Sequence, residues 1–210
     1  MARSADWYRD DENWGGPWVE VAIDLGPRDD QRLMEAFRAA WRSPLLDGPL
    51  ESRNGEPAPN IDAGFLGPFS YGTIELPSAP DRLGCIVSSV RDEESDWLDC
   101  SIPTGMLDLA YEVVHPVSHD ANAWFKDVEG ALVSIAVLVN AAVPFDLAII
   151  GDEVSGLHYA SSRRPGMAIT AEAIERTGGY LVSSKLWERL ASTAQAELLS
   201  GGLRWVRSTW

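Results

Sequence analysis

The sequence predicts an α+β fold: a mixed, mostly antiparallel sheet with a central buried helix and further helices packed against it, in a single domain. Three observations lead to this prediction. Several short segments alternate apolar and polar residues between turn residues, which is typical of half-buried strands. One long segment, 121–143, carries apolar residues at helical spacing. The predicted elements follow the order β-α-βββ-α-β-α-α-β, in which strands and helices do not alternate regularly.

The composition is that of a folded globular protein, with 45% hydrophobic and 23% charged residues among 210. We expect a polar N-terminal arm over residues 1–16 and one domain over 17–210. The start of the chain has no apolar segment that resembles a secretory signal. The most apolar run, 131–144, is too short to cross a bilayer core of ~30 Å as a helix. These features predict a cytoplasmic protein that does not enter a membrane.

The first elements have clear local signals. Residues 18–25 alternate, with apolar residues on one face and acidic residues on the other, and predict a strand. Asp29 suits the start of a helix that continues to about residue 42, with Leu33, Phe37 and Trp41 on one stripe. In the arm, the aromatic residues at 7, 8 and 14 either dock a partner or fold back over the core.

Residues 43–70 are rich in proline and glycine, and we expect a long loop there, either functional or wrapped over the surface. Segments 71–76, 83–91 and 96–102 then predict three strands in an antiparallel meander. Cys85 and Cys100 fall on the same face of that meander. A disulfide between them is conceivable, but in the expected compartment we predict two reduced, buried thiols.

The second half continues with a turn or short helix after Pro103 and the central helix over 121–143, which Pro144 ends. A continuous apolar strand follows at 145–150. Helices are expected near 170–177 and over about 184–199, each ending at a pair of glycines, and a last strand at 203–208.

The charge distribution is the most unusual feature. The first 120 residues hold 23 acidic and nine basic side chains, whereas the remaining 90 hold nine and eight, for a net charge of −15. No Lys or Arg lies between Asp92 and Phe125. The predicted hairpin tip is either a solvated turn whose charges protect strand edges, or a contact surface for a basic partner. Its candidate binding residues are Asp92, Glu93, Glu94, Asp96 and Trp97.

Two further groups of residues have the types needed for chemistry. His115, His119 and Asp120 would be weak metal ligands if they shared a helix face, but Pro116 disfavours that helix and surface histidines are the plainer interpretation. Just after the 145–150 strand lie Asp152, Glu153 and His158, weak candidates for catalysis. The alternative there is a polar turn whose carboxylates accept hydrogen bonds from backbone amides.

Within the sequence there is no phosphate-binding loop, dinucleotide fingerprint or zinc spacing, so we expect no cofactor and no nucleic-acid partner. The leading hypothesis is a non-enzymatic, acidic binding module that neutralises or regulates a basic protein, as an inhibitor or immunity-type protein would. The alternative is a small-molecule hydrolase or transferase with its site at the end of the 145–150 strand, where Asp152, Glu153 and His158 lie. A deep pocket there, holding a carboxylate of raised pKa, would favour the alternative.

Overall fold

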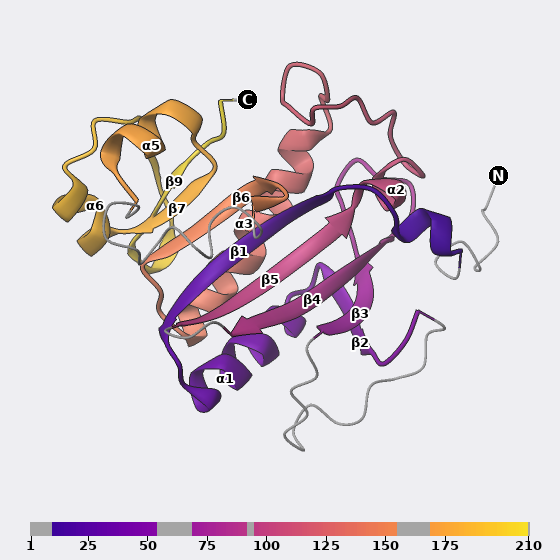
Figure 1. Ribbon diagram of the computed structural model, residues 1–210, viewed down its shortest axis with the longest axis horizontal. Helices are drawn as coiled ribbons and strands as arrows, with labels where there is room; N and C mark the ends of the chain where they lie inside the picture. Colours follow the sequence, from indigo (N-terminus) through magenta and orange to yellow (C-terminus); the bar gives the residue numbers. More distant parts are fainter. Residues whose placement is uncertain (1–9, 54–68, 92–94, 155–168, 210) are drawn as a thin grey trace.

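The computed structural model describes residues 10–53, 69–91, 95–154 and 169–209. Within them one nine-stranded sheet has helices on both faces (Figure 1). The strand order is β2-β3-β4-β5-β1-β6-β7-β9-β8, and each neighbouring pair is antiparallel. The predicted α+β class is therefore confirmed, and the sheet of the described chain is antiparallel throughout.

The strands are β1 (Trp18–Pro27), β2 (Leu46–Leu50), β3 (Phe69–Ile74), β4 (Leu83–Arg91), β5 (Ser95–Pro103), β6 (Leu147–Asp152), β7 (Tyr180–Ser183), β8 (Glu197–Leu198) and β9 (Leu203–Val206). The α-helices are α1 (Asp30–Trp41), α2 (Thr104–Leu107), α3 (Phe125–Ala142), α5 (Ala171–Thr177) and α6 (Ser184–Leu190). Short 3-10 turns η2 (Asp11–Trp14) and η4 (Ser200–Gly202) complete the described elements.

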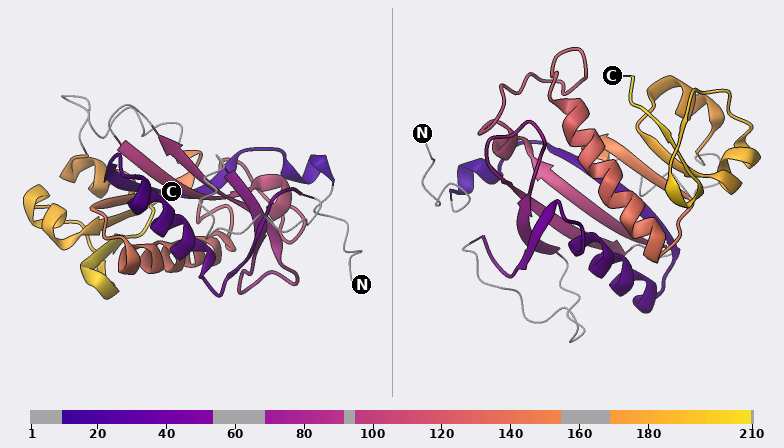
Figure 2. Two further views of the ribbon diagram at one scale, coloured as in Figure 1. Left: turned by 90° about the horizontal axis from the view of Figure 1, so that it is seen from below. Right: turned by 180° about the vertical axis from the view of Figure 1, so that it is seen from behind.

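One face of the sheet holds the main core. Helices α1 and α3 lie across it (Figure 2, right), and the alternating residues Val19, Val21 and Ile23 of β1 point into that layer. The side chain of Asp29 caps α1 by accepting from the amides of residues 31 and 32. Trp14 also joins this core and meets Tyr71 edge-on, so the part of the arm over 10–16 is docked on the domain.

The opposite face is covered only in part within the described chain. Over β6, β7 and β9, helices α5 and α6 pack through Ile174 and Leu186 onto a second apolar cluster. The neighbouring strands β1 and β5 add Ala22 and Trp97 to the same cluster. Every residue of β5 is buried, with Leu98 and Cys100 in the main core and Trp97 in the second cluster.

Three sequence predictions needed correction. The 43–70 segment was expected to lack regular structure, but it contains β2, which pairs with β3. The four-residue strand β7 was missed because glycines and a helix start flank it closely. The helix expected over 184–199 ends at Leu190, because Ala191 turns the chain with a positive φ of 51°. Glu175 then accepts from the amide and hydroxyl of Thr193 and holds the following segment against α5.

The expectation that both cysteines are buried was confirmed. Cys85 and Cys100 are free, buried thiols, and the β4–β5 register places them on one face. Burial, with the charges of Asp99 and Glu20, raises the pKa of Cys100 to about 12. Over the described ranges, no helix is both long enough and apolar enough to cross a membrane.

Candidate functional site

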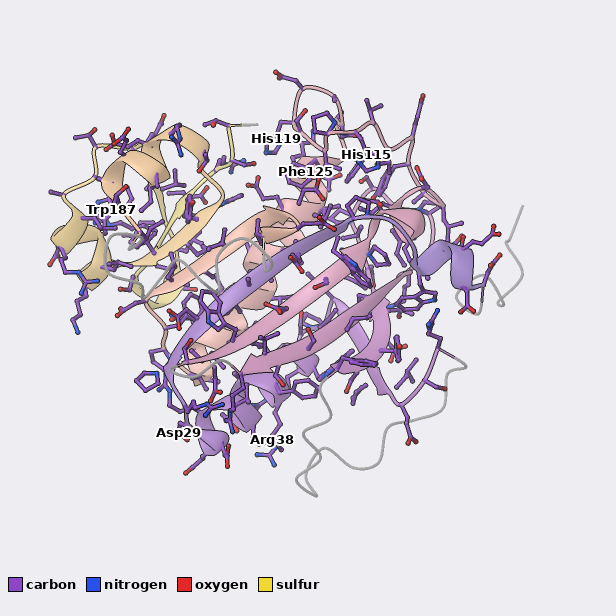
Figure 3. All side chains as sticks on the ribbon, in the orientation of Figure 1. Asp29, Arg38, His115, His119, Phe125 and Trp187 are labelled. Carbon is purple, nitrogen blue, oxygen red and sulfur yellow. The ribbon has the colours of Figure 1, made fainter. Side chains whose placement is uncertain are left out.

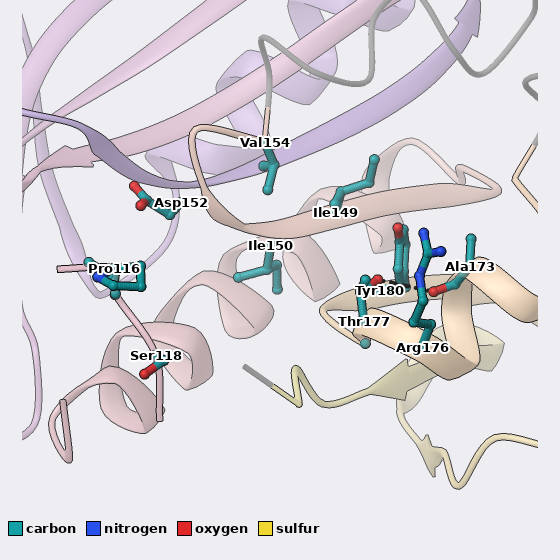
Figure 4. A pocket seen from close by; sticks show the side chains of 12 residues that line it. Pro116, Ser118, Ile149, Ile150, Asp152, Val154, Ala173, Arg176, Thr177 and Tyr180 are labelled. Carbon is teal, nitrogen blue, oxygen red and sulfur yellow. Dashed lines mark hydrogen bonds between the residues drawn. The ribbon is translucent and has the colours of Figure 1, made fainter. Parts of the chain in front are cut away.

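A pocket of about 470 Å³ opens at the end of β6, between the loop that precedes α3 and the helix α5 (Figure 4). Its floor is formed by β6 residues Ile149 and Ile150, and its walls by Pro116–Ser118 on one side and by α5 on the other. The volume lies within the range of small-molecule sites, which are typically mostly apolar with a few polar groups. Two charged residues, Asp152 and Arg176, line this pocket.

Antiparallel pairing brings these elements together. Asp152 pairs with Val19 on β1, and Ile149 pairs with Tyr180 on β7. The chain passes from α5 to β7 through Gly178, whose φ is 63°. A Cβ at Gly178 would lie 1.9 Å from the carbonyl oxygen of Arg207, so only glycine fits this turn. The tight turn is what returns Tyr180 to the pocket beside α5.

Asp152 forms one polar end of the pocket. Its Oδ1 atom is buried and has no hydrogen-bond partner among the described residues. Burial raises the pKa of this carboxyl; the charge of Glu153 raises it further, while His115 opposes the shift. A carboxyl with a raised pKa keeps its proton to a higher pH than usual, and it can donate that proton to a bound molecule or, when ionised, accept one from it. Asp152 is therefore the group best placed for chemistry in this pocket.

Arg176 lies at the opposite end, as Figure 4 shows. Its guanidinium forms no ion pair within the described chain, and Arg176 is exposed on the surface of α5. The hydroxyl of Thr177 donates to the carbonyl of Ala173 at 3.0 Å, so it is already committed to the helix. The pocket thus has an acidic end and a basic end, separated by apolar side chains.

Of the residues predicted around this strand end, the structure brings only Asp152 into the pocket. Glu153 is exposed, with a φ of 49°, and its amide donates to the carbonyl of Trp18 at 2.8 Å. His158 lies outside the described residues. Arg176 and Tyr180 were missed by sequence reasoning, because they reach the pocket only through the β6–β7 pairing and the turn at Gly178.

A serine, a histidine and a glutamate meet elsewhere. His119 Nε2 lies 2.8 Å from Ser208 Oγ and 3.2 Å from a carboxylate oxygen of Glu129. The other oxygen of Glu129 accepts from both the amide and the hydroxyl of Ser208. A catalytic triad uses the two ring nitrogens of histidine separately. Here serine and carboxylate share one nitrogen, so the cluster has the composition of a triad but not its geometry, and it anchors the chain after β9 to α3.

The predicted metal ligands do not come together. His115 and Asp120 are exposed in the loop before α3, which begins only at Phe125 (Figure 3). His119 is engaged by Glu129 and Ser208 as described. No group of three or more His, Cys, Asp or Glu in the described part of the chain could hold a metal ion.

The predicted contact surface at the hairpin tip is wrong for two of its residues. Trp97 is 0% exposed, and its Nε1 donates to the Ser95 hydroxyl. Asp96 is 1% exposed and accepts two hydrogen bonds from Arg91 and one from the amide of Asp29. The sequence suggested a solvated tip because the packing of Trp97 with side chains from distant elements has no local signal. Asp92, Glu93 and Glu94 lie outside the described residues.

The acidic first half also pairs with its own arginines. The ion pairs include Glu35–Arg42, Asp11–Arg53, Glu75–Arg82 and Asp30–Arg91. Part of the negative charge is therefore compensated within the molecule, and less of it faces a partner than the composition suggests.

Comparison of the chain with protein-family models, curated proteins and solved structures finds no match. The site must therefore be interpreted from its own geometry.

Proposed function

We propose that this protein binds a small molecule in the pocket at the end of β6. The observation that carries the proposal is Asp152 Oδ1, a buried carboxylate oxygen without a hydrogen-bond partner in the described chain, at one end of a pocket of about 470 Å³. An unsatisfied buried acceptor costs stability on the order of 1–3 kcal/mol, and a ligand that bonds to it would recover that cost.

The two ends of the pocket indicate the class of ligand. A hydroxyl, amide or amine would donate to Asp152, and a carboxylate or phosphate would pair with the Arg176 guanidinium. Between them, side chains such as Ile150 and Val117 favour an apolar body. The raised pKa of Asp152 also makes it the candidate general acid or base if the bound molecule is transformed, as in the hydrolase or transferase hypothesis.

The test is a thermal-shift screen with a defined library of small apolar carboxylic acids that bear a donor group. We expect hits that raise Tm in proportion to concentration, as ligands of the native state do. Asp152→Asn and Arg176→Met should each weaken a hit by about tenfold, while Glu188→Gln on the exposed face of α6 should not. Hits that bind all variants equally would locate the ligand elsewhere and contradict the proposal.

A second candidate keeps the acidic binding module but moves its surface to the loop before α3. Asp108, Glu112 and Asp120 are exposed there, and the rings of Tyr111 and Trp124 stack at 5.1 Å. In residues 95–154 the only Lys or Arg is Lys126. We propose that a basic protein would contact this acidic and aromatic surface.

For this candidate the test is capture from the protein's own cell extract at low salt. A basic protein should be retained, released by about 0.5 M salt, and lost when Glu112 and Asp120 are both neutralised. If retention of the partner is unchanged by salt and by these substitutions, the acidic surface does not bind that partner.

A further inference from the structure

A second groove, of about 340 Å³, lies on the face of the sheet opposite α1 and α3, over β1, β5, β4 and β3. In Figure 1 the strands β1 and β5 pass in front of α3. This groove is separate from the pocket at β6, because the two share no lining residue among those that the structure describes.

The strand register determines the groove's floor. One row of directly paired residues crosses four strands, and it consists of Glu20, Ser101, Ile86 and Tyr71. The next row on the same face consists of Ala22, Asp99, Ser88 and Phe69. Residues two apart along a strand are separated by roughly 7 Å, so the rows lie side by side. The acidic residues of both rows fall on β1 and β5, and the aromatic residues of both fall on β3.

The acidic end is unusual for a sheet face. Glu20 and Asp99 are 4% and 3% exposed, and they are diagonal neighbours on adjacent strands. The Ser101 hydroxyl donates to Glu20 Oε2 at 2.9 Å. Both carboxylates interact with groups of their own chain, but each carboxylate offers about four acceptor sites, so a ligand can share them. The described residues that line the groove include these two acids and no Lys or Arg.

The aromatic end suits the same kind of ligand. Phe69 and Tyr71 meet edge-on with centroids 5.4 Å apart, and Phe69 is 46% exposed. The Tyr71 ring already has one guanidinium nearby, since Arg53 Cζ lies 5.8 Å from its centroid. Cations are attracted to the faces of such rings, and flat apolar groups pack against them.

We propose that this groove binds a small organic cation with a flat apolar body. The amidinium, guanidinium or ammonium group would lie at Glu20 and Asp99, where a planar cation can form paired hydrogen bonds with a carboxylate. The apolar body would extend along Ile86 towards Phe69 and Tyr71. The contribution of Asp99 and Glu20 to the raised pKa of Cys100, on the other face of β5, agrees with a negative potential at this point of the sheet.

Benzamidine and its neutral isostere benzamide are suitable probes, because they have nearly the same shape and differ in charge. Binding to the full-length protein is measured by isothermal titration and ligand-detected NMR. We expect benzamidine to bind at least tenfold more tightly than benzamide. The double variant Glu20→Gln/Asp99→Asn should lose at least tenfold in affinity for benzamidine, while Asp47→Asn, an exposed acid on β2, should leave it unchanged.

A second variant protects the test against misfolding of the buried double substitution. Phe69→Ala removes a half-exposed ring and should weaken benzamidine severalfold without altering the fold. Ala173→Trp, which fills the pocket at β6, should leave benzamidine binding unchanged. A failure of the groove proposal can therefore be distinguished from a failure of the function proposed for the pocket at β6. Equal binding of the two probes, no binding of either, or benzamidine binding that survives the acidic substitutions would overturn the inference.

Discussion

At Asp152 the fold favours the neutral carboxyl, because burial raises its pKa and Glu153 adds to the shift. An acid whose pKa is raised on folding stabilises the native state most when it is protonated. This contribution to stability is fully present below ~3.9, the pKa of the carboxyl in the unfolded chain. It is lost as pH rises through the pKa that the carboxyl has in the folded protein. At neutral pH the ionised side chain therefore destabilises the native state.

Asp152→Asn should accordingly raise the free energy of unfolding at pH 7, by up to about 1 kcal/mol because the site is partly exposed to solvent. The gain over the natural protein should grow as pH rises from 4 and then level off, because Asn does not titrate. Urea unfolding of both proteins at several pH values measures it. A gain that stays constant from pH 4 to 8 would contradict the assigned shift.

For Asp96 the pKa shift has the opposite sign. Burial alone would raise its pKa, but Arg91 and the Asp29 amide lower it below the usual value. Such an acid contributes stability above ~3.9, which is lost as pH falls through the folded pKa. Asp96→Asn should lower the free energy of unfolding by about 2–4 kcal/mol at pH 7, because Arg91 then loses its buried carboxylate partner.

Asp30→Asn is the matched control, because Asp30 pairs with the same arginine but its side chain is 78% exposed. Its cost should be below about 0.5 kcal/mol. Equal costs for the two variants in urea unfolding at pH 7 would show that burial does not determine the strength of these pairs.

Among the elements, α3 and the chain after β9 are joined through Glu129, which is 1% exposed. Glu129→Gln replaces a carboxylate that accepts from Ser208 and contacts His119. We expect a loss of about 1–3 kcal/mol and faster amide hydrogen exchange in β9. Asp127→Asn, on the same helix, should leave β9 exchange unchanged, and identical exchange in the two variants would argue against this anchor.

The β2–β3 edge packs against α1 through Trp41. A Cβ at Gly72 would lie 2.4 Å from the Trp41 ring and 2.7 Å from the carbonyl oxygen of Asp47. Gly72→Ala should therefore destabilise the protein by about 1–3 kcal/mol. Gly130→Ala on α3 meets nothing within 4 Å and should stabilise by roughly 0.5–1 kcal/mol. Thermal unfolding compares the two, and a neutral Gly72→Ala would contradict the close packing of this edge.

Across the whole molecule, the sequence predicted elements with strong local signals and missed features that depend on pairing between distant segments. The alternation of 18–25 and the acidic start of the helix at Asp29 are local signals, and both elements formed as predicted. Trp97 and Asp96 were assigned to the surface because nothing near them in sequence reveals that Trp97 joins the second cluster and that Asp96 accepts from the distant amide of Asp29. The same limit applies to the site: Asp152 was predicted from its place after a strand, but Arg176 reaches the pocket only through the turn at Gly178.

The central claim, that the pocket at β6 holds a small molecule, is tested most directly by affinity selection of a defined small-molecule library with mass-spectrometric detection. The natural protein is compared with Ala173→Trp, which fills the pocket, and with Ala171→Trp, the same substitution on α5 at a residue that does not line it. We predict a ligand that the natural protein and Ala171→Trp retain and Ala173→Trp loses. Equal retention by all three proteins, or by none, would contradict the account.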